Sequence, residues 1–179
     1  MKDYDAPLAA LTAGKEAWAK TSTAERVKVL KSVKKATAQV AEGWALASAR
    51  GKLIPGGSPL VGEEWLLGPY ALLAACDALI ETLEQMDERR CLQRLRRRYT
   101  ASGQLALRVL PRRPIDELLF SGVSAEVWME KGLSEVGLKD ATASAYAVPE
   151  AERKGAVALV LGAGNVSSIA PLDCFQKLF

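Results

Sequence analysis

The sequence predicts an incomplete α/β fold in which helices come first, a β arm follows, and one strand and one helix of an α/β sheet come last. Three observations predict it. Apolar residues recur at helical spacing through most of residues 1–102. After Gly103 the pattern partly alternates, as it does in strands. Ala156–Leu161 is a short apolar run that enters a glycine-rich turn, which is typical of a buried parallel strand.

Two helices are predicted in the first fifty residues. The first covers residues 8–20, where apolar side chains follow helical spacing. The second begins after Ser22, which has Glu25 three residues later, the spacing of a capping box. This helix is predicted to run to about Ala49 and to face the core with a stripe made of Val27, Leu30, Val33, Val40 and nearby alanines.

Residues 51–59 (GKLIPGGSP) form a break rich in turn residues, and a long helical pattern resumes at Glu63. Gly68-Pro69 predicts an interruption near the start of that helix, because proline disfavours the helical conformation of the residue before it. No run approaches the roughly 18 consecutive apolar residues of a membrane span, so we expect no membrane partner.

Six arginines lie within the twelve residues Asp87–Arg98, a density that suggests nucleic-acid binding. No aromatic side chains are interleaved among them for base stacking, and the net charge of the chain is only +3. We therefore predict a solvated helix face, or a face that meets an acidic neighbouring subunit, and no nucleic-acid partner.

Residues 103–130 are predicted to form an extended hairpin or small sheet, the β arm. Gln104–Leu110 partly alternates and ends at a Pro-Arg-Arg-Pro turn. Glu117–Phe120 and residues 123–129 supply further β-prone pieces. Because the edges of such a sheet need a partner, the arm favours association between chains.

Residues 131–154 are polar and are predicted to be a connection, so that residues 155–179 begin a second domain. Its strand is followed by a predicted helix over Ser168–Phe179, in which Pro171 suits the first turn. The apolar face of this helix is expected to consist of Leu172, Phe175, Leu178 and Phe179.

The amino-acid composition limits the kinds of catalytic and metal site that these residues can form. With 49% hydrophobic and 25% charged residues among 179, the chain has the balance of a globular protein. The three cysteines are odd in number and lack metal-ligand spacing, which predicts free thiols, no metal site and a cytoplasmic location. No histidine is present, which excludes Ser-His and Cys-His catalysis and the usual zinc hydrolase sites from these residues.

Three interpretations of the turn Gly162-Ala163-Gly164-Asn165-Val166-Ser167 remain open. The dinucleotide fingerprint requires glycine or alanine where Ser167 stands, so a phosphate-cradling loop matches only in part. A plain strand-to-helix turn without chemistry is the second. In the third, the glycines present Asn165, whose side-chain N–H could stabilise an oxyanion that develops on a carbonyl.

The segment GAGNVSSIAPLD resembles the segment of the aldehyde dehydrogenase superfamily that carries its asparagine, often Pro-Trp-Asn-Phe-Pro. Ala163-Gly164 replaces the Pro-Trp pair here, and Val166-Ser167 replaces Phe-Pro. The order of helices, β arm and nucleotide-binding strand is similar to that family over nearly the whole chain. The stretches 58–70 and 118–129 are similar to a bacterial branch, and Gly-Asn-Val resembles the acyl-CoA reductase branch.

The resemblance implies a Rossmann-like nucleotide-binding domain and a β arm that acts as an oligomerisation hairpin. It makes Asn165 the oxyanion-stabilising residue and Leu161, Gly162 and Ala163 candidates for contact with an NAD or NADP cofactor. The alternative is that Asn165 only tolerates an unusual backbone angle after Gly164. In the family, the nucleophilic Cys, the general-base Glu and the Lys that holds the adenosine ribose all come later in the chain.

The cysteines present are not expected to replace the missing nucleophile. Cys174 is predicted to be a core or near-core thiol, Cys76 to pack inside an apolar helix, and Cys91 to lack an acid–base partner.

We therefore expect the amino-terminal fragment of an NAD(P)-dependent aldehyde dehydrogenase-like oxidoreductase that acts on an aldehyde or acyl-CoA. As a homo-oligomer it would associate through the β arm. The chain alone is expected to be inactive. The alternatives are a noncatalytic oligomerisation module and a fragment of an acyl-CoA reductase.

Overall fold

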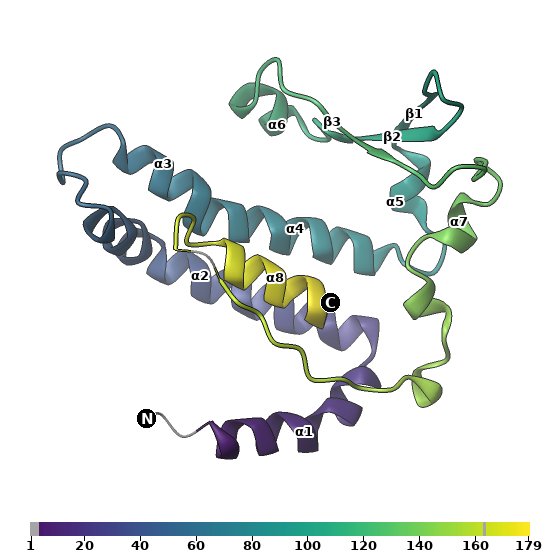
Figure 1. The fold of residues 1–179 in the computed structure, drawn as a ribbon, viewed down its shortest axis with the longest axis horizontal. Coiled ribbons are helices and arrows are strands. Elements are labelled where there is room, and N and C mark those ends of the chain that lie inside the picture. Colours follow the sequence, from purple (N-terminus) through teal and green to yellow (C-terminus); the bar gives the residue numbers. More distant parts are fainter. Residues whose placement is uncertain (1–3, 163) are drawn as a thin grey trace. The chain divides into compact units, whose positions relative to one another are not determined.

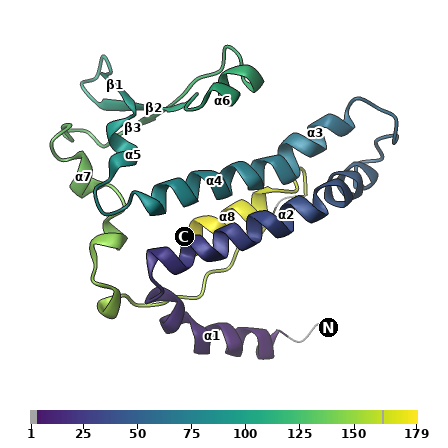
Figure 2. The same cartoon turned by 180° about the vertical axis from the view of Figure 1, so that it is seen from behind.

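The computed structural model describes residues 4–162 and 164–179 and divides into two compact units. Unit 1 comprises Met1–Glu84 and Pro149–Phe179, and unit 2 comprises Gln85–Val148. Figures 1 and 2 show that unit 1 consists of helices and extended chain, while unit 2 carries the strands.

Unit 1 is built around a helical hairpin. Helix α2 lies alongside α4, and the turn-rich segment predicted at 51–59 connects them through α3 and η1 (Figures 1 and 2). Helix α8 packs against α4, although it comes almost ninety residues later in the sequence. The elements of the unit are α1 (Asp5–Ala19), α2 (Thr23–Gly51), α3 (Val61–Trp65), η1 (Leu66–Tyr70), α4 (Ala71–Glu84), η3 (Glu150–Glu152) and α8 (Ile169–Leu178).

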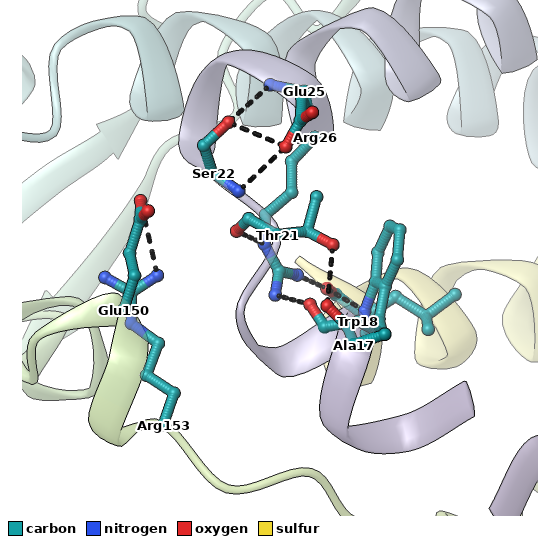
Figure 3. Close-up of polar contacts among 9 residues, drawn as sticks. Ala17, Trp18, Thr21, Ser22, Glu25, Arg26, Glu150 and Arg153 are labelled. Atoms are coloured by element: carbon teal, nitrogen blue, oxygen red, sulfur yellow. Dashed lines mark hydrogen bonds and ion pairs between the residues drawn. The ribbon is translucent and has the colours of Figure 1, made fainter. Parts of the chain in front are cut away.

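The predicted capping box at the start of α2 is confirmed. The Ser22 hydroxyl accepts a hydrogen bond from the Glu25 backbone N–H at 3.3 Å, and the Glu25 carboxylate accepts one from the Ser22 backbone N–H at 3.3 Å (Figure 3). The exchange satisfies two backbone N–H groups that the first helical turn leaves without partners.

The core of unit 1 lies between α2, α4 and α8 and is lined with small side chains along α2. Val27 and Leu30 are buried as predicted, but Val40 is 57% exposed, which corrects the predicted stripe. The alanines of the predicted stripe are buried at Ala41, Ala45 and Ala49, and their short side chains let two helices approach closely. The buried apolar residues of the unit are Val27, Leu30, Ala41, Ala45, Ala49, Leu72, Cys76, Ile80, Leu83 and Phe175.

The long apolar helix contains the predicted interruption. A single π-helical turn, η1, separates α3 from α4, and Gly68 within it has φ −112° and ψ −108°, outside the helical region. Val61–Glu84 is long and apolar enough to cross a membrane by length and composition only, a test that the core helix of a soluble protein also passes. Here Leu72, Cys76, Ile80 and Leu83 contribute to the buried core.

Arg26 joins the ends of two helices, α1 and α8, in unit 1. Its buried guanidinium donates to the backbone carbonyls of Trp18 at the end of α1, of Thr21 just before α2, and of Leu178 at the end of α8. Figure 3 shows the guanidinium between the Thr21 and Trp18 backbone. Because the last carbonyls of a helix have no partner inside it, one cation here satisfies groups from two helix termini.

Unit 2 contains a three-stranded antiparallel sheet in the order β1-β2-β3, with β1 (Arg96–Tyr99), β2 (Leu105–Leu110) and β3 (Ala125–Trp128). The predicted small sheet is therefore present, but it begins seven residues before residue 103. Leu105 and Leu107 of β2 form its core with Leu138, and Leu92, Leu95, Met129 and Leu133 pack around them. Leu138 belongs to α7 (Leu138–Ala141), so the segment predicted as a connection contributes to this core.

The arginine-rich segment is not the helix face that was predicted. It forms a turn, the short helix α5 (Arg90–Gln93) and then strand β1. Arg98 makes a bidentate ion pair with Glu126 of β3, at 2.9 and 2.6 Å, and Arg97 pairs with Glu135 at 2.8 Å. These carboxylates are distant in sequence, so the local pattern did not reveal the strand.

Glu117–Phe120 is also corrected, because these residues belong to or directly follow helix α6 (Pro114–Leu119) and form no strand. Pro114 occupies the first turn, and the Asp116 carboxylate accepts hydrogen bonds from the backbone N–H groups of Arg112 and Arg113 at 3.0 and 2.9 Å. These capping contacts start a helix where β propensity alone predicted extended chain. The 3-10 turn η2 (Ser144–Ala147) completes the unit.

The strand predicted at Ala156–Leu161 is wrong for this chain. These residues are extended but unpaired in the described part of the structure, and Leu159 and Leu161 are 84% and 81% exposed. The physical reason is that a parallel strand needs neighbouring strands and covering helices, and the described residues place none beside it. The predicted last helix is confirmed as α8.

Candidate functional site

Asn165 lies in a bend between the unpaired extended segment and α8, four residues before the helix begins. Its side chain is exposed, and in the described ranges 4–162 and 164–179 no residue forms a hydrogen bond with it. An amide N–H with no partner among these residues can donate to a group that arrives from outside.

The chain just after Asn165 is fixed by two hydroxyl groups. The Trp44 indole Nε1–H donates to the Ser167 Oγ at 2.8 Å, and the Ser168 hydroxyl donates to the backbone carbonyl of Leu67. Ser168 is 1% exposed, so its hydroxyl needs this acceptor. The turn is thereby attached to α2 and to η1, two elements that come about a hundred residues earlier.

The predicted cofactor residues do not form a cofactor site by themselves. Leu161 is exposed and offers only an apolar side chain and backbone groups. A Cβ at Gly162 would lie 2.8 Å from the Ala170 Cβ, so this glycine is explained by contact with α8 rather than by space for a phosphate. Ala163 lies outside the described residues. These positions do not fit a complete nucleotide site.

Of the three interpretations of the turn, the phosphate-cradling one loses its main support. Gly162 is required by packing, and a Cβ at Gly164 would meet nothing within 4 Å. The glycine spacing therefore needs no pyrophosphate to account for it. The plain turn and the presentation of Asn165 both remain compatible with the geometry, and they differ only in what the exposed amide contacts.

The cysteines fall in different environments. Cys174 is exposed on α8, which corrects its predicted core position. Cys76 is fully buried as predicted, and burial, reinforced by the nearby Asp77 carboxylate, raises the pKa of its thiol. A buried thiol with a raised pKa is a poor nucleophile at neutral pH. Cys91 is partly buried beside the arginine-rich turn.

No group of three or more Cys, Asp or Glu side chains that could hold a metal ion occurs among the residues that the structure describes. The one strongly buried carboxylate of α3 is Glu64, which is 1% exposed and pairs with Lys52 Nζ at 2.6 Å. This pair ties the end of α2 to the start of the long apolar helix.

Sequence reasoning identified the turn but missed the residues that hold it. Trp44 follows no motif, and its partner Ser167 lies 123 residues later. Gly68-Pro69 was predicted to interrupt the helix. The sequence did not show that the turn of Asn165 contacts this interruption. A tryptophan on an otherwise alanine-lined helix face was the only available signal.

Comparison of the chain with protein-family models, with curated proteins and with solved structures finds no match.

Proposed function

We propose that this chain is the amino-terminal portion of an aldehyde dehydrogenase-like oxidoreductase of the cytoplasm, in which Asn165 stabilises the oxyanion. The proposal is supported by the segment GAGNVSSIAPLD, by the order of helices, antiparallel arm and glycine-rich turn, and by the exposure of the Asn165 amide. The exposed amide on an anchored turn is the observation that carries it.

Stabilisation of an oxyanion requires a hydrogen-bond donor that is held at a fixed position. A cysteine thiolate that attacks an aldehyde or thioester carbonyl pushes negative charge onto the carbonyl oxygen, and an amide N–H stabilises that charge. Such a donor is most effective where water is excluded, because hydrogen bonds to charge strengthen at low dielectric. An exposed Asn165 therefore needs further protein to cover it.

In this proposal, residues outside 1–179 supply the nucleophilic Cys, the general-base Glu and most of the NAD or NADP site. Leu161, Gly162 and Ala163 contribute one edge of that site at most. The 179-residue chain by itself is then inactive, and catalysis belongs to the assembled enzyme.

The test uses the complete translation product of the reading frame that encodes residues 1–179. It is assayed for NAD⁺- and NADP⁺-dependent oxidation of aldehydes, with and without coenzyme A. Asn165→Ala is expected to lower kcat by about 10²- to 10³-fold, with KM and nucleotide affinity little changed. A requirement for coenzyme A would identify the acyl-CoA reductase type.

The matched control is Gln176→Ala, which removes an exposed amide from α8 and is expected to leave kcat unchanged. Two results would contradict the proposal. One is the absence of any aldehyde- or acyl-CoA-dependent change in nucleotide absorbance, and the other is full activity in the Asn165→Ala enzyme.

A second candidate function is a noncatalytic module that associates through the sheet of unit 2. The observation in its favour is the exposed apolar surface on edge strands β1 and β3, where Tyr99, Val127 and Trp128 are 52%, 48% and 56% exposed. Under this candidate, the purified chain forms dimers or larger oligomers at micromolar concentration in sedimentation experiments.

Val127→Glu is expected to dissociate these oligomers, whereas Val136→Glu is the control, because Val136 is 91% exposed in the same unit but outside the sheet. A chain that sediments as a monomer throughout would remove this candidate.

A further inference from the structure

The turn that carries Asn165 rests on a break in the long apolar helix. In a regular α-helix the Ala71 backbone N–H would donate to the Leu67 carbonyl, four residues earlier. In the structure it donates to the Gly68 carbonyl. The Leu67 carbonyl takes the Ser168 hydroxyl as a donor. The π-helical turn η1 thus supplies an acceptor that a regular helix would have used internally.

Gly68 makes room for the second attachment. A Cβ at this position would lie 3.2 Å from the Ser167 Oγ and 3.5 Å from the Trp44 Nε1. These two atoms are the acceptor and donor of the 2.8 Å hydrogen bond between the turn and α2. A side chain at residue 68 would therefore press on that hydrogen bond, and glycine lets the indole, the hydroxyl and the helix backbone meet.

The remaining end of the turn is held by packing. The Gly162 Cα is approached so closely by Ala170 that a Cβ there would lie 2.8 Å from the Ala170 Cβ. Asn165 lies in a bend between these fixed points, three residues after Gly162 and two before Ser167. These contacts hold the backbone on either side of Asn165.

We propose that Trp44 is a positioning residue for the Asn165 amide, acting through Ser167 at the glycine kink of η1. This inference rests on the function proposed above for Asn165. Trp44 touches no reacting atom; its indole N–H fixes the carboxyl end of the turn so that the amide is oriented before substrate arrives. Preorganised donors of this kind contribute most of their effect because they need no rearrangement during reaction.

The hydrogen bond between Trp44 and Ser167, the anchor of the turn, is tested first in the 179-residue chain, without any catalytic assay. Trp44→Phe keeps an aromatic ring but removes the N–H donor. It is expected to speed amide hydrogen exchange of Ile169 and Leu172, whose N–H groups donate to the Val166 and Ser168 carbonyls, about tenfold or more. Ser167→Ala should do the same, and the double variant should exchange no faster than the faster single variant, because both remove one hydrogen bond.

The matched control is Trp65→Phe, which changes a 40%-exposed tryptophan on α3 and should leave exchange at Ile169 and Leu172 unchanged. Unchanged exchange in the Trp44→Phe chain overturns the anchor. Equal acceleration by Trp65→Phe also overturns it, because the effect would then be a general loosening of unit 1.

The positioning role is tested in the complete enzyme with a double-mutant cycle. Trp44→Phe is expected to lower kcat about 10- to 100-fold at nearly constant KM, since small misplacements of a catalytic group have effects of this size. In an Asn165→Ala background the same substitution should cost nothing further. A merely structural role would lower kcat by the same factor in both backgrounds, and that result overturns the proposal.

The two proposals fail in distinguishable ways. If Asn165→Ala alone leaves kcat unchanged, the proposed function fails, and with it the catalytic purpose of the anchor. If Asn165→Ala lowers kcat but Trp44→Phe does not, the proposed function stands and the positioning role of Trp44 is refuted.

Discussion

The guanidinium of Arg26 lies over the indole ring of Trp18, with its Cζ 4.7 Å from the ring centroid. Both side chains donate to the same acceptor, the Leu178 backbone carbonyl at the end of α8; the Trp18 Nε1 does so at 3.1 Å. The Trp18 ring also meets the Phe179 ring edge to face at 5.7 Å between centroids. The end of α8 is thus fixed by one cation and one aromatic residue, as its beginning is fixed by Trp44.

The first prediction concerns this buried cation. Arg26→Met leaves the carbonyls of Trp18, Thr21 and Leu178 without their shared donor and should destabilise unit 1 by about 3 kcal/mol. Arg26→Lys keeps the charge but not the planar fork, and a loss of about 1–2 kcal/mol is expected. Urea denaturation followed by far-UV circular dichroism measures both.

Arg50→Lys serves as the control, because Arg50 is exposed in the last turn of the same helix. It should change the free energy of unfolding by less than about 0.5 kcal/mol. An Arg26→Met chain as stable as the Arg50→Lys chain would show that water and the remaining donors, the Trp18 indole for Leu178 and the Thr21 N–H for Trp18, satisfy these carbonyls.

The sequence predicted the features of this fold whose causes are local. The Ser22–Glu25 capping box, the break at 51–59 and the interruption at Gly68-Pro69 depend on residues within a few positions of one another. Helix α8 was likewise visible from Pro171 and the spacing of its apolar residues. In each case, backbone geometry or a short-range hydrogen bond decides the outcome, so the pattern is sufficient.

Features that depend on distant partners were not predictable in this way. Strand β1 forms from arginines because Glu126, 28 residues from Arg98, compensates their charge across the sheet. The hydrophobic segment 156–161 has the composition of a buried strand but no strand beside it in the described residues. Of the candidate site, Asn165 was identified from its turn, whereas Trp44 could be linked to it only through the fold.

The second prediction compares two glycines in unit 1. A Cβ at Gly155 would lie 2.1 Å from the Lys15 backbone oxygen, so Gly155→Ala must displace backbone and should cost about 2–3 kcal/mol. Gly155 also donates its backbone N–H to the Glu16 carboxylate at 3.2 Å, a contact that such a displacement would break.

Gly14→Ala is the matched control and should act in the opposite direction. Gly14 lies inside α1 and a Cβ there would meet nothing within 4 Å, so the substitution is expected to stabilise by roughly 0.5–1 kcal/mol through helix propensity. Thermal unfolding of both variants measures the difference. Equal effects of the two substitutions would argue against close contact between Gly155 and α1.

The third prediction concerns the buried carboxylate of Glu64. Lys52→Met leaves this carboxylate buried without its cation and should destabilise the chain by about 3 kcal/mol. Adding Glu64→Met should recover most of that loss, because two apolar side chains remove the uncompensated charge together. The measurement is a double-mutant cycle on the free energy of unfolding in urea.

The exposed pair of Lys31 and Glu84 provides the comparison. Their side chains are 58% and 50% exposed at a separation of 2.8 Å, so Lys31→Met should change stability by less than about 0.5 kcal/mol. If Lys52→Met were equally mild, the Glu64 carboxylate would have to reach water in the native chain.

The last prediction concerns the pH dependence of unit 2. Burial raises the pKa of Asp116, but hydrogen bonds from the backbone N–H groups of Arg113 and Arg112, with the Arg113 charge, outweigh it and lower the pKa overall. A carboxyl group with a lowered pKa in the folded state stabilises fully above its ordinary pKa, and the contribution is lost as pH falls through the lowered value.

Asp116→Asn should therefore destabilise unit 2 by about 1 kcal/mol at neutral pH, since it weakens the cap of α6. The difference from the unsubstituted chain should stay constant down to about pH 4 and shrink at lower pH, as Asp116 itself becomes protonated. Hydrogen exchange of the β2 amides between pH 2.5 and 7 measures it, corrected for the intrinsic exchange rate. Asp87→Asn, at an exposed turn position of the same unit, should show no such dependence. A difference that persists unchanged to the lowest pH would mean that the charge of Asp116 contributes nothing to the cap.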